Sequence, residues 1–205
     1  MKYSKTVYWK YMQGKRKIII AVTGASGAIY AESLLGKING LEDKPGEVAL
    51  VLTKNAAGIW EYELGNEFQP EAYREINIRQ YENTDFYAPI ASGSAKYDTM
   101  IICPASMGML GRIANGTADD LISRAADVML KERRKLLLVP RETPYNLVHI
   151  NNMKLLTQAG AIILPASPSF YSKPLTVSDL VMTVVERIID IAGFEQQAKR
   201  WGDAL

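Results

Sequence analysis

Five runs of apolar residues recur along the chain, and within them hydrophobic and polar positions do not alternate. Continuous runs of Val, Ile and Leu are typical of strands that are buried on both faces, as in a parallel sheet. The expected strands are 17–24, 47–53, 98–105, 135–142 and 160–167. Helical periodicity between and after these runs predicts helices at 26–39, 54–64, 119–134, 145–159 and 177–192. Alternating strands and helices predict a doubly wound α/β domain, with the less regular segment 65–97 as a small excursion from it.

Length and composition agree with one globular domain. The chain has 205 residues, of which 48% are hydrophobic, and this is enough for one large core but makes two full domains unlikely to fit. We divide it into an N-terminal extension, residues 1–16, and a single α/β domain, residues 17–205. The extension is rich in basic and aromatic residues but lacks the apolar segment of a secretory signal, so we expect either a mobile arm or an extension that packs on a neighbour.

The charge balance and the apolar runs narrow the choice of partners. A net charge of +2 gives no general attraction to nucleic acid or to a membrane surface. No apolar run approaches the length that spans a membrane. The expectation is a cytoplasmic protein that binds neither nucleic acid nor membrane.

A single cysteine and a single histidine limit the chemistry further. Cys103 has no partner for a disulfide within the chain, and it lies in an apolar run typical of a core. His149 alone cannot build a conventional zinc site. We therefore expect a reducing compartment and a reaction that does not depend on a metal.

Every predicted strand ends in small or polar residues. In an open α/β sheet, ligands bind outside the carboxyl ends of the strands. These ends therefore predict a pocket that is rich in hydroxyl and backbone N–H groups. They are residues 23–26, 53, 104–106, 141–142 and 165–167.

The turn after the first strand is suited to an anion. Gly24 and Gly27 permit a sharp turn and a close approach of a ligand to the backbone. Ser26 is expected to cap the following helix, whose free N–H groups would then face a phosphate. Thr53 stands at the end of the second strand where a dinucleotide's ribose would need an acidic residue, and this favours FMN over NAD. By itself the pattern also fits a plain strand–helix turn.

The segment 104–134 carries a second set of candidates. Residues 104–111 are expected to form a loop of small residues that could contact a flavin or a phosphate. On the helix that follows, Arg124 and Lys131 lie seven residues apart on one face, with Asp127 between them. Either these cations reach the pocket or they belong to a solvated stripe of ion pairs.

The third candidate is the pair Arg141 and Glu142, which ends an apolar run and is followed by Thr143-Pro144. A carboxyl group held between burial and a neighbouring guanidinium could transfer protons near neutral pH. The alternative is a structural salt bridge that closes the strand.

Together these segments resemble the UbiX-type flavin prenyltransferases. The motifs occur in the order of that family, and the resemblance runs from about residue 17 to residue 201. They are GASGAIY (24–30), ASGS (91–94), PASMG (104–108), SRAADVMLKERR (123–134), LVPRETP (138–144) and the Phe170-Tyr171 pair. The resemblance implies a three-layer flavodoxin-like or Rossmann-like sheet and a homo-oligomer, commonly a dodecamer.

The resemblance also implies a reaction. Family members transfer a dimethylallyl group from dimethylallyl phosphate to N5 and C6 of reduced FMN, without a metal, and the prenylated FMN serves UbiD-type decarboxylases. The residues implied to hold FMN are Gly24, Ala25, Ser26, Thr53, Ser106, Met107, Gly108, Met109 and Arg124. Those implied to hold the prenyl phosphate are Lys131, Arg141, Tyr171 and Arg187. Glu142 is the implied acid/base residue, assisted by Ser26 and Lys131, and Glu63 is expected nearby.

One departure from the family pattern affects the expected flavin contacts. Relatives often carry SMKT or SMGT where this chain has Ser106-Met107-Gly108-Met109, so a methionine replaces a hydroxyl residue. Contacts to a flavin at this position are therefore expected from the backbone.

Two other functions remain open. A flavin-dependent cysteine decarboxylase shares the fold and a similar IANGxADDL segment, but such enzymes use a histidine upstream of that segment, and here none precedes His149. A non-catalytic flavin-binding subunit of a decarboxylase would share the binding residues, although Glu142 and Tyr171 favour an enzyme.

Overall fold

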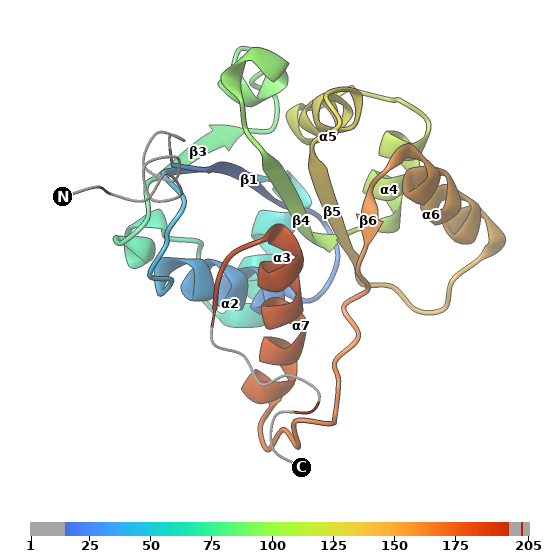
Figure 1. Ribbon diagram of the computed structural model, residues 1–205. Helices are drawn as coiled ribbons and strands as arrows, with labels where there is room; N and C mark the ends of the chain where they lie inside the picture. The colour runs from blue at the N-terminus through green and yellow to red at the C-terminus, as the bar shows by residue number, and fades with distance from the viewer. Residues whose placement is uncertain (1–14, 197–201, 203–205) are drawn as a thin grey trace, which may run out of the picture.

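Six parallel strands form one sheet in the order β3-β2-β1-β4-β5-β6, with helices on both faces (Figure 1). This computed structural model describes residues 15–196 and residue 202. Most of the proposed N-terminal extension lies outside the described residues, and so does Trp201. The strands are β1 (Lys17–Val22), β2 (Glu47–Leu52), β3 (Ile78–Glu82), β4 (Thr99–Ala105), β5 (Lys135–Pro140) and β6 (Ile162–Ile163).

The helices alternate with the strands, as the sequence predicts. They are α2 (Ala28–Asn39), α3 (Lys54–Leu64), α4 (Met107–Ala114), α5 (Leu121–Lys131), α6 (Leu147–Ala159) and α7 (Val177–Ala192). Three short 3-10 helices, η1 (Pro70–Tyr73), η2 (Pro89–Ala91) and η3 (Gly93–Ala95), lie in the connections around β3. The doubly wound α/β fold is confirmed.

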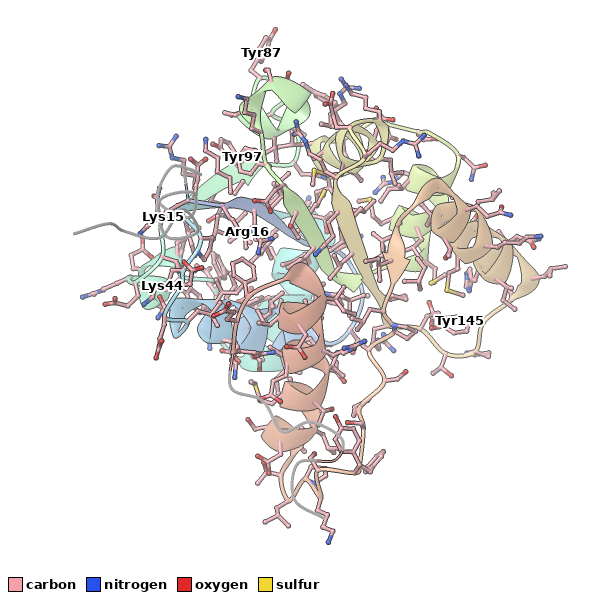
Figure 2. All side chains as sticks on the ribbon, in the orientation of Figure 1. Lys15, Arg16, Lys44, Tyr87, Tyr97 and Tyr145 are labelled. Carbon is pink, nitrogen blue, oxygen red and sulfur yellow. The ribbon has the colours of Figure 1, made fainter. Side chains whose placement is uncertain are left out.

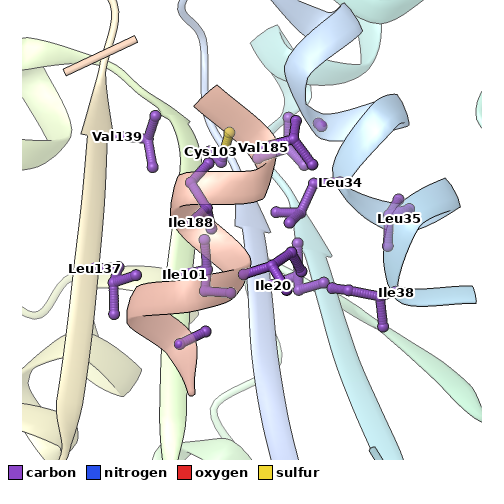
Figure 3. Close-up of a cluster of buried hydrophobic side chains, with 14 of the residues drawn as sticks. Ile20, Leu34, Leu35, Ile38, Ile101, Cys103, Leu137, Val139, Val185 and Ile188 are labelled. Atoms are coloured by element: carbon purple, nitrogen blue, oxygen red, sulfur yellow. The ribbon is translucent and has the colours of Figure 1, made fainter. Parts of the chain in front are cut away.

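The core has two layers because the central strands are buried on both faces. One face of the sheet, with Ile20, Ile101 and Leu137, packs against α2 and α7 (Figure 3). The helical side chains on that face include Leu34, Leu35, Ile38, Val185 and Ile188. The other face packs against α4, α5 and part of α6. Burial on both sides explains why these strands read as unbroken apolar runs.

The strand order reverses between β1 and β4, which are neighbours in the sheet although β2 and β3 lie between them in the sequence. This order is that of a Rossmann-like sheet, in which the crevice for ligands opens at the carboxyl ends of the two strands that flank the reversal. The turn after Val22 and the residues after Ala105 are therefore the first places to look for a site.

Three expectations from the sequence need correction. The excursion 65–97 contains a sixth strand, β3, which pairs with β2 and has mostly exposed, polar residues because it lies at the edge of the sheet. The fifth expected strand shrinks to β6, although Leu164 and Ala166 still donate backbone hydrogen bonds to β5. The expected loop 104–111 is the end of β4 followed at once by α4, which begins at Met107.

The segment between β3 and β4 leaves the body of the domain and returns to it. Tyr87, fully exposed, lies at its tip, and Tyr97 lies where the segment rejoins the sheet (Figure 2). The Tyr97 hydroxyl donates a hydrogen bond to the buried carboxylate of Glu47, which anchors this return beside the amino end of β2.

Candidate functional site

Thr23 joins the two loops that flank the reversal of strand order. Its side chain is buried, and its hydroxyl donates to the carbonyl of Pro104 at 3.0 Å. The same oxygen accepts a hydrogen bond from the Ser106 backbone N–H at 2.7 Å. These bonds fix the ends of β1 and β4 side by side. The sequence predicted that the strand ends lie together, but it did not assign a role to Thr23. The signal that could have identified Thr23 is that a hydroxyl residue ends the first apolar run.

The turn from Gly24 to Gly27 is built differently from the expectation. Gly27 is the N-cap of α2, with a left-handed φ of 112°, and no side chain of the turn caps the helix. The prediction that Ser26 is the cap is therefore wrong. The carboxylate of Glu63, from α3, takes this place and accepts hydrogen bonds from the backbone N–H groups of Gly27 at 2.9 Å and Ala28 at 2.8 Å.

Glu63 changes what this helix end can bind. Burial acts to raise the pKa of Glu63, but hydrogen bonds from Ser26, Gly27 and Ala28 and the nearby charge of Arg141 outweigh it and lower the pKa. An anionic carboxylate therefore already occupies the position where the sequence predicted a phosphate. A phosphate at this edge of the sheet needs other donors.

Arg141 reaches the turn from the end of β5. Its Nε donates to the Ser26 carbonyl at 2.8 Å, and its own backbone N–H points to the Ala105 carbonyl at 3.4 Å. The Arg141 guanidinium thus lies beside Ser26 and Glu63 at the carboxyl edge. The hydrogen bond from Arg141 to Ser26 joins the turn after β1 to the end of β5.

Glu142 follows Arg141 and is partly exposed. Its Oε1 accepts a hydrogen bond from the Thr143 backbone N–H at 2.9 Å. Among the described residues, no ion pair joins Arg141 to Glu142, so the alternative of a salt bridge that closes the strand is not what forms. The guanidinium and the carboxylate remain separate groups at one edge.

Thr53 and Ser106 each cap a helix that starts at this edge. The Thr53 hydroxyl accepts from the Ala56 N–H at 3.1 Å, and the Ser106 hydroxyl accepts from the Met109 N–H at 3.3 Å. Around Gly108, in the first turn of α4, there is open space, because a Cβ added there would meet no atom within 4 Å. Met107 and Met109 are buried in the core, so only their backbones are available to a ligand.

This donor set fits FMN. Backbone N–H groups at the start of α4 and hydroxyls at the ends of β1, β2 and β4 are suited to a phosphate and to the polar edge of a flavin. Thr53 at the end of β2 leaves no carboxylate for the ribose of a dinucleotide. FMN would be held by Gly24, Ala25, Ser26, Thr53 and residues 106–109.

The cations of α5 form a second group. The Arg124 Nε donates to the Ala91 carbonyl at 3.1 Å, and its Nη1 pairs with Asp127 at 3.0 Å. The Lys131 Nζ pairs with Glu132 at 3.0 Å, at the far end of the helix. Seven residues separate Arg124 from Lys131, about 10 Å along the helix axis. Both side chains therefore lie along the segment that contains ASGS.

Within one chain, Lys131 lies near the amino ends of the strands, whereas Arg141 lies at their carboxyl ends. β5 begins four residues after Lys131 and ends just before Arg141, and a strand of this length spans about 20 Å. The structure of one protomer does not bring these two cations together.

The last two candidates, Tyr171 and Arg187, lie outside the strand-tip residues and the cations of α5. Tyr171 is half exposed in the connection from β6 to α7, beyond the carboxyl edge. Arg187 lies on the exposed side of α7, ten residues after the helix begins, which is about 15 Å along its axis. There it lines a shallow cavity of about 600 Å³ with Asp190 and Phe194.

The predicted site residues thus fall into two groups on one chain, with Tyr171 and Arg187 outside both. The strand-tip group contains Gly24, Ala25, Ser26, Thr53, residues 106–109, Arg141 and Glu142, together with Glu63. The second group is Arg124 with Lys131. His149 has a local role, because it takes part in a capping box with Asn146 at the start of α6.

Comparison with known proteins decides the family. The Flavoprotein family model matches residues 7–193. Over 187 residues the chain is 44% identical to the flavin prenyltransferase UbiX of Methanocaldococcus jannaschii, a match that covers 91% of this chain and 98% of the relative. The chain belongs to the UbiX family of flavin prenyltransferases.

Solved structures agree with this UbiX assignment. A UbiX (PadA1) crystal structure in complex with FMN and dimethylallyl pyrophosphate superposes with a TM-score of 0.82 at 38% identity, over 92% of this chain and all of that one. A dodecameric FMN-dependent UbiX-like decarboxylase from Escherichia coli O157:H7 also gives 0.82, at 40% identity over 90% of this chain and 98% of that one. The family resemblance drawn from the motifs is therefore confirmed.

The described residues of this UbiX-family chain lack two features. No helix within them is long and apolar enough to cross a membrane. Nor do residues 15–196 gather three or more His, Cys, Asp or Glu side chains in a group that could hold a metal ion.

Proposed function

We propose that this chain transfers the dimethylallyl group of dimethylallyl phosphate to reduced FMN, with new bonds at N5 and C6, and releases prenylated FMN. Membership of the UbiX family supports this reaction. The observation that carries it is the hydrogen bond from Arg141 to the Ser26 carbonyl, which holds a cation at the strand tips proposed to bind the flavin, at the same edge of the sheet as Glu142.

The reaction needs two kinds of stabilisation. When an allylic phosphate ionises, the leaving phosphate gains charge that fixed cations stabilise, and the allyl cation is stabilised by an adjacent π surface. Arg141, Lys131 and Arg187 supply cations, and Tyr171 supplies an aromatic face. Reduced FMN, held by residues 24–26, Thr53, residues 106–109 and Arg124, supplies the electron-rich nucleophile.

Lys131 and Arg187 lie away from Arg141 in one protomer, so we assign the complete site to a homo-oligomer in which neighbouring protomers contribute them. A dodecamer is the assembly we propose, by analogy with the dodecameric relative. Tyr171, on a connection that extends beyond the carboxyl edge, is suited to reach a neighbouring protomer.

Proton transfer is assigned to Glu142. Its carboxylate accepts a hydrogen bond from the adjacent Thr143 N–H, and it lies at the strand tip, where it can take up a proton when C6 forms its bond. Ser26 and Glu63, which are hydrogen-bonded to each other, provide a second path for the proton.

Asp119 and Asp120 do not serve as a magnesium motif in this proposal. The Asp120 carboxylate caps α5 through Ser123, accepts from Asn83 and pairs with Arg112 at 3.1 Å. Arg112 also lies 3.8 Å from Asp119. These acids are committed to the start of α5, which supports a metal-independent transfer.

The product is of use only to an enzyme that binds prenylated FMN, and we propose a UbiD-type decarboxylase as its recipient. A cytoplasmic setting fits this chemistry, because the reaction consumes reduced FMN.

The test is a direct assay. The purified protein is incubated without oxygen with reduced FMN and either dimethylallyl phosphate or the pyrophosphate, and the extracted flavin is analysed by mass spectrometry. We expect a flavin enlarged by one dimethylallyl group with at least one donor. Recovery of unmodified FMN from a protein that binds FMN would instead indicate a non-catalytic flavin-binding subunit.

A further inference from the structure

The C-terminal end of α5 holds a small charged network around Glu132. One carboxylate oxygen of Glu132 lies 3.0 Å from the Lys131 Nζ, and the other lies 3.6 Å from the Arg134 Nη2. The hydrogen bond from Lys131 is the main cause that lowers the pKa of Glu132. The carboxylate is therefore charged when it contacts both cations.

Glu132 is also packed against the ASGS segment. A Cβ added to Gly93 would overlap Glu132 Oε1 and would lie 2.7 Å from the carboxyl carbon of Glu132. This is closer than side-chain atoms approach each other, so Glu132 uses space that exists only because residue 93 is glycine. Gly93 does not have a positive φ, so its backbone does not require glycine.

Arg134 fixes the other side of this network. Its Nη2 donates to the Gly93 carbonyl at 2.7 Å, and its Nη1 donates to the Tyr97 carbonyl at 3.1 Å. Glu132 is thus held between the anchored Arg134 guanidinium and the closely packed backbone at Gly93. It therefore differs from a member of an isolated surface ion pair, whose side chain is free to move. Isolated surface pairs contribute little because both side chains remain free to move.

We propose that Glu132 is a positioning residue for Lys131, which it holds ready to bind the phosphate of the prenyl donor. This inference rests on the proposed function and assigns to Glu132 a role that the proposed reaction does not include. A lysine has a flexible four-carbon stem and three donors on one ammonium group. One N–H of Lys131 bonds to Glu132 and fixes the ammonium group, and two N–H groups remain for phosphate oxygens. Less conformational entropy of Lys131 is therefore lost when dimethylallyl phosphate binds.

The test compares E132A and E132Q with the wild type in steady-state kinetics. Removing the carboxylate frees Lys131, so we expect the E132A variant to raise the KM for dimethylallyl phosphate about tenfold, with kcat and FMN affinity changed less than about threefold. The E132Q variant keeps an oxygen that accepts from Lys131 but loses the charge, and we expect a KM rise of about threefold. The matched control is E42Q, which removes an exposed acid in the connection between α2 and β2.

A double-mutant cycle separates positioning of Lys131 from a general structural effect. If Glu132 acts through Lys131, then E132A has no further effect on KM in a K131A background. Equal KM rises from E132A in the wild-type and K131A backgrounds would overturn the proposal, and so would an unchanged KM in E132A alone.

The G93A variant tests the same network from the other side. Its new methyl group must displace Glu132, so KM should rise as in E132A, and adding G93A to E132A should cause no further rise. A further rise in the double variant would contradict the packing argument. Failure of the wild type to prenylate FMN would reject the proposed function itself, whereas an active wild type with an unaffected E132A variant rejects only this inference.

Discussion

The strand-tip turn and the end of α5 both hold charged groups assigned to one reaction, but they are built in opposite ways. At the turn, the groups are joined within one chain: Thr23 ties two loops together, Glu63 caps α2, and Arg141 binds the Ser26 carbonyl. At the end of α5, the exposed Lys131 and Glu132 pair with each other, and Arg134 is a second cation beside Glu132. The turn is held together by contacts within one protomer, whereas at the end of α5 we propose that Lys131 binds a ligand.

Glu63 at the turn and Glu132 at the end of α5 differ in the groups that stabilise their carboxylates. Glu63 is stabilised largely by the Ser26 hydroxyl and backbone N–H groups, which cannot leave without unfolding the start of α2. Glu132 is stabilised mainly by the Lys131 side chain, whose ammonium group has two further donors for another anion. One carboxylate therefore maintains the fold, and the other keeps a cation available for a ligand.

The largest expected effect is at the strand tip, where E142Q removes the proposed acid/base group. General acid–base catalysis typically contributes a hundredfold or more, about 2.7 kcal/mol. We expect the E142Q variant to bind FMN normally but to form prenylated FMN at least about a hundredfold more slowly, as measured by mass spectrometry of the flavin over time.

The E42Q variant again serves as the control, with no expected change. A wild-type rate in E142Q would remove Glu142 from the mechanism. The strand tip would then have a role in binding alone, as we propose for Lys131 at the end of α5.

The next effect tests whether the turn is held together inside one chain. In the T23V variant the Ser106 N–H loses its acceptor in a buried position, so we expect the free energy of unfolding to fall by about 1–3 kcal/mol. Urea denaturation followed by circular dichroism measures it. T157V, which alters an exposed threonine of α6 whose hydroxyl bonds to its own helix, is the matched control.

A T23V variant as stable as the T157V control would mean that the two loops do not depend on this hydroxyl. The strand-tip group would then be as loosely held as the cations of α5, and the contrast between the two regions would fail.

How far the sequence could predict this protein differs between fold and site. The buried strands were readable because burial on both faces leaves an unbroken apolar run, as in Ile18–Ile20. The edge strand β3 was missed because only Ile78 and Tyr81 are partly buried, so no run forms. α4 was expected as a loop because its glycines, Gly108 and Gly111, weaken the helical signal.

The sequence could predict which candidates lie at the strand ends, but not how the candidate residues are arranged in space. Motif order named Arg141, Glu142 and Lys131, and the rule that ligands bind at strand ends placed the first two correctly at one edge. Glu63 as the cap of α2 could not be read locally, because it lies thirty-six residues from Gly27. The separation of Lys131 from Arg141 follows from the direction of β5, which only the assembled sheet defines.

A smaller effect with a pH signature is expected at Glu63. Because the folded state lowers its pKa, the carboxylate stabilises the fold at pH values above the unfolded pKa, near 4.3, and this contribution is lost as the pH falls through the folded pKa. The side chain is exposed, so we expect the E63Q variant to lose less than about 1 kcal/mol at pH 7.

The difference between wild type and E63Q should shrink below pH 4 and vanish once the wild-type carboxylate is protonated. Urea denaturation at a series of pH values checks this. A difference that stays constant from pH 7 to pH 3 would show that the charge of Glu63 does not stabilise the start of α2.

The smallest effect is expected on α5, and it tests whether the cations there contribute to the fold. Arg124 and Asp127 form a partly exposed pair three residues apart, 3.0 Å between charged atoms, of the kind that stabilises a helix by only a few tenths of a kcal/mol. The D127N variant should therefore change the free energy of unfolding by less than about 0.5 kcal/mol. Because the Arg124 Nε remains bonded to the Ala91 carbonyl, FMN affinity should also stay within about threefold. A loss above 1 kcal/mol would mean that the ion pairs of α5 maintain the fold, as Glu63 does at the turn, and that its cations are less free to meet a ligand.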